Sequence, residues 1–214
     1  MAPGTGPLGV LRRVRARQAE AGRALAHAAG EKPCELCAEP VEADHGHLVD
    51  LEGRGLFCAC RACHLLFSSP GAGGHRYRSV PDRYVTVPTE GLSPAPWEAL
   101  RVPVSVAYFF LNSTLQRLVA FYPSPAGATE SLLPPASWDD AVAASPVLAT
   151  LEADVEALLV RTHRDGSAEC YVVPIDACYE LVGQLRTCWR GFDGGAEAHA
   201  ALDAFFARVR ERAA

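Results

Sequence analysis

Two pairs of cysteines constrain the fold of this chain more than any other feature. Each pair has the spacing Cys-x-x-Cys, and 22 residues separate the first pair from the second. Two thiolates at this spacing reach one cation from a single tight turn, and a second such turn completes a tetrahedron of four sulfurs. The pattern therefore predicts one four-cysteine metal site with these ligands: Cys34, Cys37, Cys60 and Cys63.

The segment between the two pairs supports this geometry. It reads as a strand at residues 47–51, a turn at 52–55 and a returning strand at 56–58. A turn, a hairpin and a second turn make up the plan of a zinc ribbon, and closed four-cysteine sites are usually structural zinc sites. We therefore expect a zinc-ribbon-like module over residues 31–70 that depends on its metal, because so small a module lacks a sufficient core.

Iron is the alternative metal, either as a mononuclear site of the rubredoxin type or as an iron–sulfur cluster. A rubredoxin-like site generally has glycine directly after the second cysteine of each pair, where backbone N–H groups approach the sulfurs. Ala38 and His64 occupy these two positions here. The departure favours zinc over an electron-transfer metal.

Cys58 is a further candidate for a metal ligand. It lies two positions before Cys60, so the two side chains would share one side of a strand. Cys58 can therefore replace Cys60, join a cluster, or act as a small buried apolar residue. The repeated spacing favours Cys60. Three nearby histidines can also ligate a metal, although hydrogen-bonding or surface roles are more common for such residues: His45, His47 and His64.

Composition narrows the class of protein. With 49% hydrophobic residues and a net charge of −5, the chain is typical of a soluble globular protein, and its acidic balance disfavours a nucleic-acid partner. Metal-like cysteine spacing and the lack of an apolar signal core predict a protein of the reducing cytoplasm. No run approaches the roughly 18 apolar residues of a membrane helix, so no membrane insertion is expected.

The chain divides into three predicted parts. Residues 1–30 form a Pro/Gly-rich lead and an Arg-rich helix, which either docks on an acidic partner or RNA or, as we favour, packs weakly on its own domain. The metal module follows, and residues 65–74 read as a turn-rich, flexible exit. Residues 76–214 should form the main domain.

Hairpins and helices alternate in this main domain, which predicts an α+β fold. The first hairpin is expected at residues 102–111 and 115–122, and the second at 155–161 and 168–173. Helices are expected from Ser137, from about Asp176, and near the C-terminus. The helical spacing predicts these core residues: Cys178, Leu181, Val182, Leu185, Cys188, Trp189, Leu202, Phe205, Phe206 and Val209. Cys170, Cys178 and Cys188 are accordingly interpreted as buried thiols.

A conspicuous loop is expected at residues 123–130. Ser124, Thr129 and Glu130 can in principle bind a small molecule there, but a structural turn is favoured. No nucleophile and base can be paired from the sequence, so no catalytic residue is proposed and a non-enzymatic function is favoured.

Several segments together resemble one bacterial family of unknown function. The resemblance covers nearly the whole chain beyond residue 8. The segments are CELC (34–37), HLVDL (47–51), CACRAC (58–63), FYPSPAGATES (121–131), DVEALLV (154–160) and PIDACYELVG (174–183).

Members of that family tend to be encoded beside nickel–iron hydrogenases. The resemblance therefore implies a hydrogenase-linked accessory role, and it supplies no catalytic residues. We expect a non-catalytic, metal-binding interaction or maturation factor whose partner is a hydrogenase subunit or its assembly machinery. An iron-binding electron-transfer protein associated with the hydrogenase is the alternative.

Overall fold

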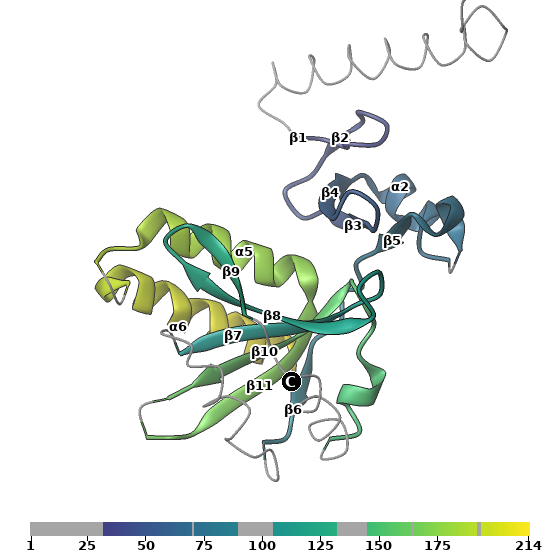
Figure 1. Cartoon of the computed structure of the whole chain (residues 1–214). Helices are drawn as coiled ribbons and strands as arrows, with labels where there is room; N and C mark the ends of the chain where they lie inside the picture. The colour runs from purple at the N-terminus through teal and green to yellow at the C-terminus, as the bar shows by residue number, and fades with distance from the viewer. Residues whose placement is uncertain (1–31, 70, 90–104, 132–144, 164, 192–193) are drawn as a thin grey trace, which may run out of the picture. The chain divides into compact units, whose positions relative to one another are not determined.

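The structure is a computed structural model that describes residues 32–69, 71–89, 105–131, 145–163, 165–191 and 194–214 (Figure 1). The chain divides into two compact units, of which the first ends at Val80 and the second begins at Pro81. The Arg-rich helix expected in residues 1–30 and the helix expected from Ser137 lie outside the described residues.

The first unit is built on a three-stranded antiparallel sheet. Its strands are β3 (Gly46–Asp50), β4 (Gly55–Ala59) and β5 (Tyr77–Ser79), in the order β4-β3-β5. The β3–β4 pair is the hairpin predicted between the two cysteine pairs. Two short strands, β1 (Lys32–Pro33) and β2 (Pro40–Val41), pair with each other around the first cysteine pair.

An ion pair stabilises the turn end of the β3–β4 hairpin. Asp50 is 2% exposed and accepts two hydrogen bonds from the Arg76 guanidinium, at 3.1 and 2.7 Å. Its Oδ1 also accepts the backbone N–H groups of Glu52 and Gly53, which closes the turn. Arg76 above all holds the pKa of Asp50 at about 2, well below its usual value. The carboxylate therefore fixes both the turn and the chain that leads into β5.

Helical structure begins within the second cysteine pair and recurs in the segment 65–74, which was expected to be an irregular exit. Helix α2 spans Arg61–Leu66, and a short 3-10 helix, η1, spans Ala72–His75. Arginine, alanine and leucine are good helix formers, and no glycine or proline interrupts the stretch from residue 61 to 66. The expectation of a flexible linker over residues 65–74 is therefore wrong for these two turns of helix.

The second unit contains a six-stranded antiparallel sheet in the order β6-β11-β10-β7-β8-β9. The two predicted hairpins are present as β7–β8 and β10–β11, and pairing of β10 with β7 joins them. The strands are β6 (Val85–Val87), β7 (Val106–Asn112), β8 (Arg117–Ser124), β9 (Gly127–Ser131), β10 (Glu156–Thr162) and β11 (Ala168–Pro174).

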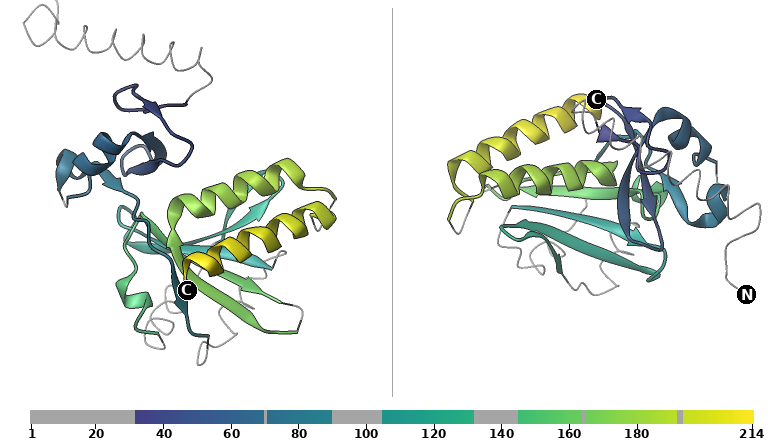
Figure 2. Two further views of the ribbon diagram at one scale, coloured as in Figure 1. Left: turned by 180° about the vertical axis from the view of Figure 1, so that it is seen from behind. Right: turned by 90° about the horizontal axis from the view of Figure 1, so that it is seen from above.

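Two helices cover one face of this sheet: α5 (Ile175–Cys188) and α6 (Gly195–Arg212) (Figure 2). Most of the predicted core positions are buried on them, whereas Cys188 and Trp189 are only partly buried. The buried helix residues are Ile175, Ala177, Cys178, Leu181, Val182, Leu185, Ala198, Leu202, Phe205, Phe206 and Val209. Helices and antiparallel strands together make the described chain α+β, as predicted.

The opposite face of the sheet carries a second apolar cluster. Phe109 and Leu158 belong to it, together with Leu148 of a short 3-10 helix, η2 (Leu148–Thr150). Successive strand residues point to opposite faces, so Leu158 joins this cluster while its neighbour Leu159, which is fully buried, points to the helical side. Both faces of the sheet are therefore apolar.

The segment at residues 123–130 is a tight hairpin, not the expected loop. Strands β8 and β9 pair up to Ser124 and Gly127, leaving two residues for the turn. The polar side chains proposed as ligand-binding groups bind protein groups instead. The Thr129 hydroxyl donates to the Ser124 hydroxyl at 3.0 Å, and Arg117 forms an ion pair with Glu130 at 3.1 Å. Strand pairing continues because Pro-Ala-Gly supplies turn chemistry between two extended segments.

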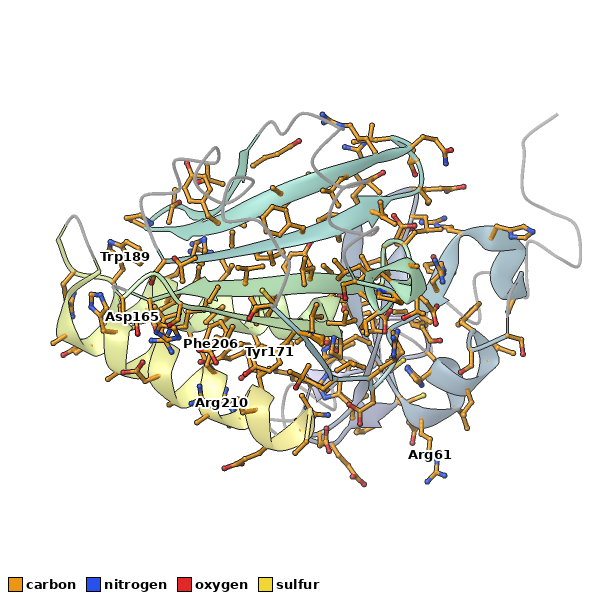
Figure 3. All side chains as sticks on the ribbon, turned by 90° about the horizontal axis from the view of Figure 1, so that it is seen from below. Arg61, Asp165, Tyr171, Trp189, Phe206 and Arg210 are labelled. Atoms are coloured by element: carbon orange, nitrogen blue, oxygen red, sulfur yellow. The ribbon has the colours of Figure 1, made fainter. Side chains whose placement is uncertain are left out.

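Aromatic and charged side chains join α6 to β11. The rings of Tyr171 and Phe206 have centroids 6.3 Å apart (Figure 3). The Arg161 guanidinium on β10 lies 5.1 Å from the Phe206 ring centroid. Arg210 donates to Glu169 at 2.9 Å. Phe206 itself is fully buried, so this contact is a principal part of the core of the second unit.

Candidate metal centre

The first cysteine pair lies in a tight turn between β1 and β2. Cys34 donates its backbone N–H to Glu39 at 2.7 Å, and Ala38 donates to the Cys34 carbonyl at 2.8 Å. Ala38 has a φ of 67°, a left-handed conformation that glycine adopts most readily. The turn is therefore formed with alanine in a position where rubredoxin-like sites generally have glycine.

The second pair lies where strand β4 passes into helix α2. Cys60 immediately precedes the helix and Cys63 is in its first turn, with the His64 N–H donating to the Cys60 carbonyl at 2.9 Å. Glu35 joins the first pair to strand β4, because its N–H donates to the Cys58 carbonyl at 2.9 Å and its carboxylate accepts the Cys58 N–H at 2.7 Å. The first pair is thus held by a turn between two strands, and the second by the junction of a strand with a helix.

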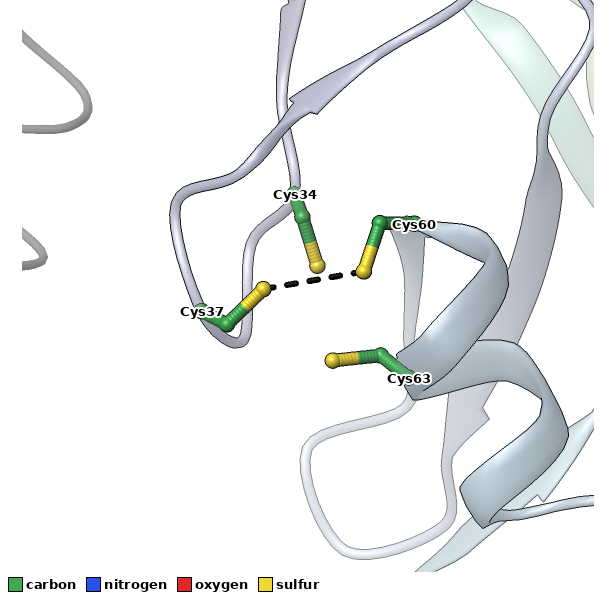
Figure 4. Close-up of side chains that lie close together, drawn as sticks. All are labelled: Cys34, Cys37, Cys60 and Cys63. Atoms are coloured by element: carbon green, nitrogen blue, oxygen red, sulfur yellow. Dashed lines mark hydrogen bonds between the residues drawn. The ribbon is translucent and has the colours of Figure 1, made fainter.

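The four predicted sulfurs converge on one point (Figure 4). All four Sγ atoms lie within 4.8 Å of one another, and those of Cys37 and Cys60 are 3.6 Å apart. A tetrahedral zinc ion with Zn–S bonds of about 2.3 Å places its sulfurs roughly 3.8 Å apart. A disulfide would require about 2.05 Å, and all eight cysteines are free thiols. The arrangement fits one metal ion held by four thiolates.

The surroundings give these thiols different proton affinities. Burial opposes ionisation of Cys34, but backbone hydrogen bonds, first from Cys60, outweigh it and lower the pKa of Cys34 to about 7. Burial and the neighbouring thiols raise the pKa of Cys37, and they raise that of Cys63 much further. A divalent cation can displace these protons, so metal binding at this site is coupled to proton release.

Cys58 lies outside the four-sulfur cluster. Its Sγ instead lies within 4.8 Å of ring nitrogens of His45 and His47. His64 belongs to neither group, because its Nε2 is 3.2 Å from the Val80 carbonyl oxygen and its ring lies against Gly46. Sequence spacing alone did not predict that Cys58 and two histidines meet. The pairing of His47 with Cys58 across the hairpin was the signal that could have found it.

The three remaining cysteines belong to the second unit. Cys170 and Cys178 are buried, as predicted, and burial raises the pKa of both thiols, to about 12 for Cys170. Cys188 is partly buried and donates to the Gln184 carbonyl at 3.3 Å. Among the described residues, none of these three thiols is part of a group arranged to hold a metal.

Fold and site together define an α+β protein with a four-cysteine cluster that can hold a metal ion. The chain belongs to DUF5947, a family of unknown function whose model matches residues 33–213. No curated protein and no solved structure matches the chain. Within the described residues, no helix is long and apolar enough to cross a membrane.

Proposed function

We propose that the chain is a non-catalytic accessory protein in which a zinc-ribbon-like module supports binding to a protein partner. The observation that carries the proposal is the convergence of the four sulfurs of Cys34, Cys37, Cys60 and Cys63. Four protein ligands complete a tetrahedral zinc shell and leave no position for a substrate. The metal would therefore hold the first unit in shape rather than perform chemistry.

Exposed apolar side chains beside the site supply the argument for a partner. Leu65 and Leu66 are 60% and 65% exposed, and α2 has no buried residue. Arg61, at the start of the same helix, is also exposed (Figure 3). Large apolar side chains next to a rigid metal site favour contact with another protein, because burying them there would stabilise a complex.

The partner in this proposal is a subunit of a nickel–iron hydrogenase or a component of its maturation machinery. This part rests on the family resemblance of the sequence. The surface formed by Leu65 and Leu66 adds a specific requirement, namely an apolar patch on the partner. The chain would act as an interaction or maturation factor for the enzyme.

Co-purification tests this function. Tagged protein from its native host is expected to retain a hydrogenase subunit or maturation protein, and the double variant Leu65→Asp/Leu66→Asp is expected to lose it. Leu115→Asp is the matched control, because Leu115 is 39% exposed in the second unit and lies far along the chain from α2. The proposal is wrong if the wild-type protein retains no hydrogenase component and deletion of its gene leaves hydrogen uptake intact.

An iron-binding electron-transfer protein is the alternative. The left-handed conformation of Ala38 is compatible with it, because the first turn keeps the backbone shape that glycine usually provides in rubredoxin-like sites. Cys37 is exposed, which would bring the metal close to an electron donor. Metal analysis and a visible spectrum of anaerobically purified protein separate the two functions. Zinc in a colourless protein supports the accessory role, and thiolate-to-iron absorbance supports the carrier.

A further inference from the structure

A second group of metal-ligating side chains lies in the first unit, apart from the four cysteines. It consists of His45, His47 and Cys58, whose ring nitrogens and sulfur lie within 4.8 Å of one another. His47 on β3 faces Cys58 on β4 as a cross-strand pair. His45 immediately precedes β3, and its ring centroid is 4.8 Å from that of His47. Hairpin register therefore brings all three ligands together.

A hydrogen bond at Nδ1 of His45 leaves the Nε2 atom of this residue available to bind a metal. Its Nδ1 is 2.7 Å from the Glu42 carbonyl oxygen, and a carbonyl only accepts, so Nδ1 carries the proton. In the neutral ring, Nε2 then presents its lone pair. Within the described part of the chain, no hydrogen-bond partner reaches this buried Nε2. Metal-bound histidines typically donate their other ring N–H to a carbonyl or carboxylate in this way.

The backbone of Cys58 is held equally firmly. Its carbonyl accepts the Glu35 N–H and its own N–H donates to the Glu35 carboxylate, in addition to its place in the β3–β4 pair. The sulfur of Cys58 is directed to the histidines and is not one of the four clustered sulfurs. The two groups thus have no ligand in common.

We propose that His45, His47 and Cys58 form a second metal site that binds a divalent cation of the zinc class. Two imidazoles and one thiolate suit such a borderline cation, and a set of three protein ligands leaves a fourth coordination position. All three residues are intermediate in burial. On binding, the Cys58 thiol releases its proton to solvent and forms a metal–sulfur bond.

A cation at this site requires a definite spacing between its three ligand atoms. Bonds of about 2.0 to 2.3 Å from one cation place ligand atoms roughly 3.3 to 3.8 Å apart. Small rotations of the side chains bring atoms that already lie within 4.8 Å to this spacing. The proposal does not depend on the partner of the protein.

Zinc content of the full chain tests the second site. The protein is loaded with zinc alone, freed of weakly bound metal by gel filtration, and measured for zinc per chain. Wild type is expected to hold two zinc ions, whereas Cys58→Ser and His45→Gln each hold one. His75→Gln and Cys188→Ser are the matched controls, because His75 is exposed and Cys188 lies in the second unit. Both controls should keep two.

X-ray absorption at the zinc edge gives a second readout that needs no variant. Wild type is expected to show two imidazole nitrogens and five sulfurs shared by two zinc ions, with Zn–N near 2.0 to 2.1 Å and Zn–S near about 2.3 Å. In Cys58→Ser only a four-sulfur shell should remain. A wild-type spectrum with sulfur ligands alone overturns the proposal, as does a second zinc that persists in both Cys58→Ser and His45→Gln.

Discussion

At the scale of single residues, the four-cysteine site combines thiols with unequal proton affinities. Cys34 has a pKa lowered to about 7 by backbone hydrogen bonds that outweigh its burial. Burial and neighbouring thiols raise the pKa of Cys37 and of Cys63 above the ordinary value of 9.0. At neutral pH in the metal-free protein, the last two are therefore protonated, and a metal must displace both protons.

Metal affinity should accordingly depend steeply on pH. Displacement of at least two protons predicts that apparent zinc affinity rises by at least about 100-fold per pH unit between about pH 6 and 7.5. The sign follows from the raised pKa values, since a lower pH supplies the protons that compete with the metal. Competition with a chromophoric chelator measures this slope. An affinity that stays constant across this range would contradict thiolate ligation.

At the scale of secondary structure, helix α6 shows how one residue supports the second unit. Phe206 is fully buried and lies between Tyr171, Phe205 and the Arg161 guanidinium. Phe206→Ala is expected to lower the free energy of unfolding of this unit by about 3 to 5 kcal/mol, because it leaves a cavity in a packed core. Denaturant unfolding followed by circular dichroism measures the loss.

A matched substitution checks the specificity of that effect. Tyr179 lies on α5 but is 47% exposed, so Tyr179→Ala should change the free energy of unfolding by well under half as much. Zinc content should be unchanged in both variants, since neither residue belongs to the first unit. Equal losses for the two variants would contradict the assignment of Phe206 to the core.

The elements that could be predicted from the sequence are those marked by an apolar run between turn residues or by an apolar face that repeats at helical spacing. Strands β7, β8, β10 and β11 are of the first kind, and the apolar stripe of α6 is of the second. Helix α2 could not be predicted in this way, because all its residues remain accessible and no apolar face repeats. The β8–β9 hairpin was missed because Pro, Ala and Gly at its turn also fit a longer loop.

The same limit applies to the two metal-ligating groups. The four-cysteine cluster could be predicted because each pair is local and its spacing reflects the geometry of one turn. The cluster of His45, His47 and Cys58 depends on the register of β3 with β4, which places His47 opposite Cys58. A shift of one residue would move every side chain to the other face, so sequence spacing alone did not indicate it.

At the scale of the whole molecule, the two units depend on different sources of stability. The second unit has an apolar core on both faces of its sheet. The part of the first unit that the structure describes has few fully buried large side chains, among them Leu48. A structural zinc ion typically contributes about 10 kcal/mol or more to such a module. Loss of the metal should therefore unfold the first unit and leave the second folded.

Hydrogen exchange of the Cys63→Ser variant, compared with wild type under zinc-loaded conditions, tests this central claim most directly. Cys34→Ser should behave in the same way. We expect backbone amides in residues 34–66 to lose protection while those in α5, α6 and the six-stranded sheet keep it. A Cys63→Ser protein with full zinc content, an unchanged melting profile and wild-type protection in β3 and β4 would contradict a structural metal held by these four thiolates.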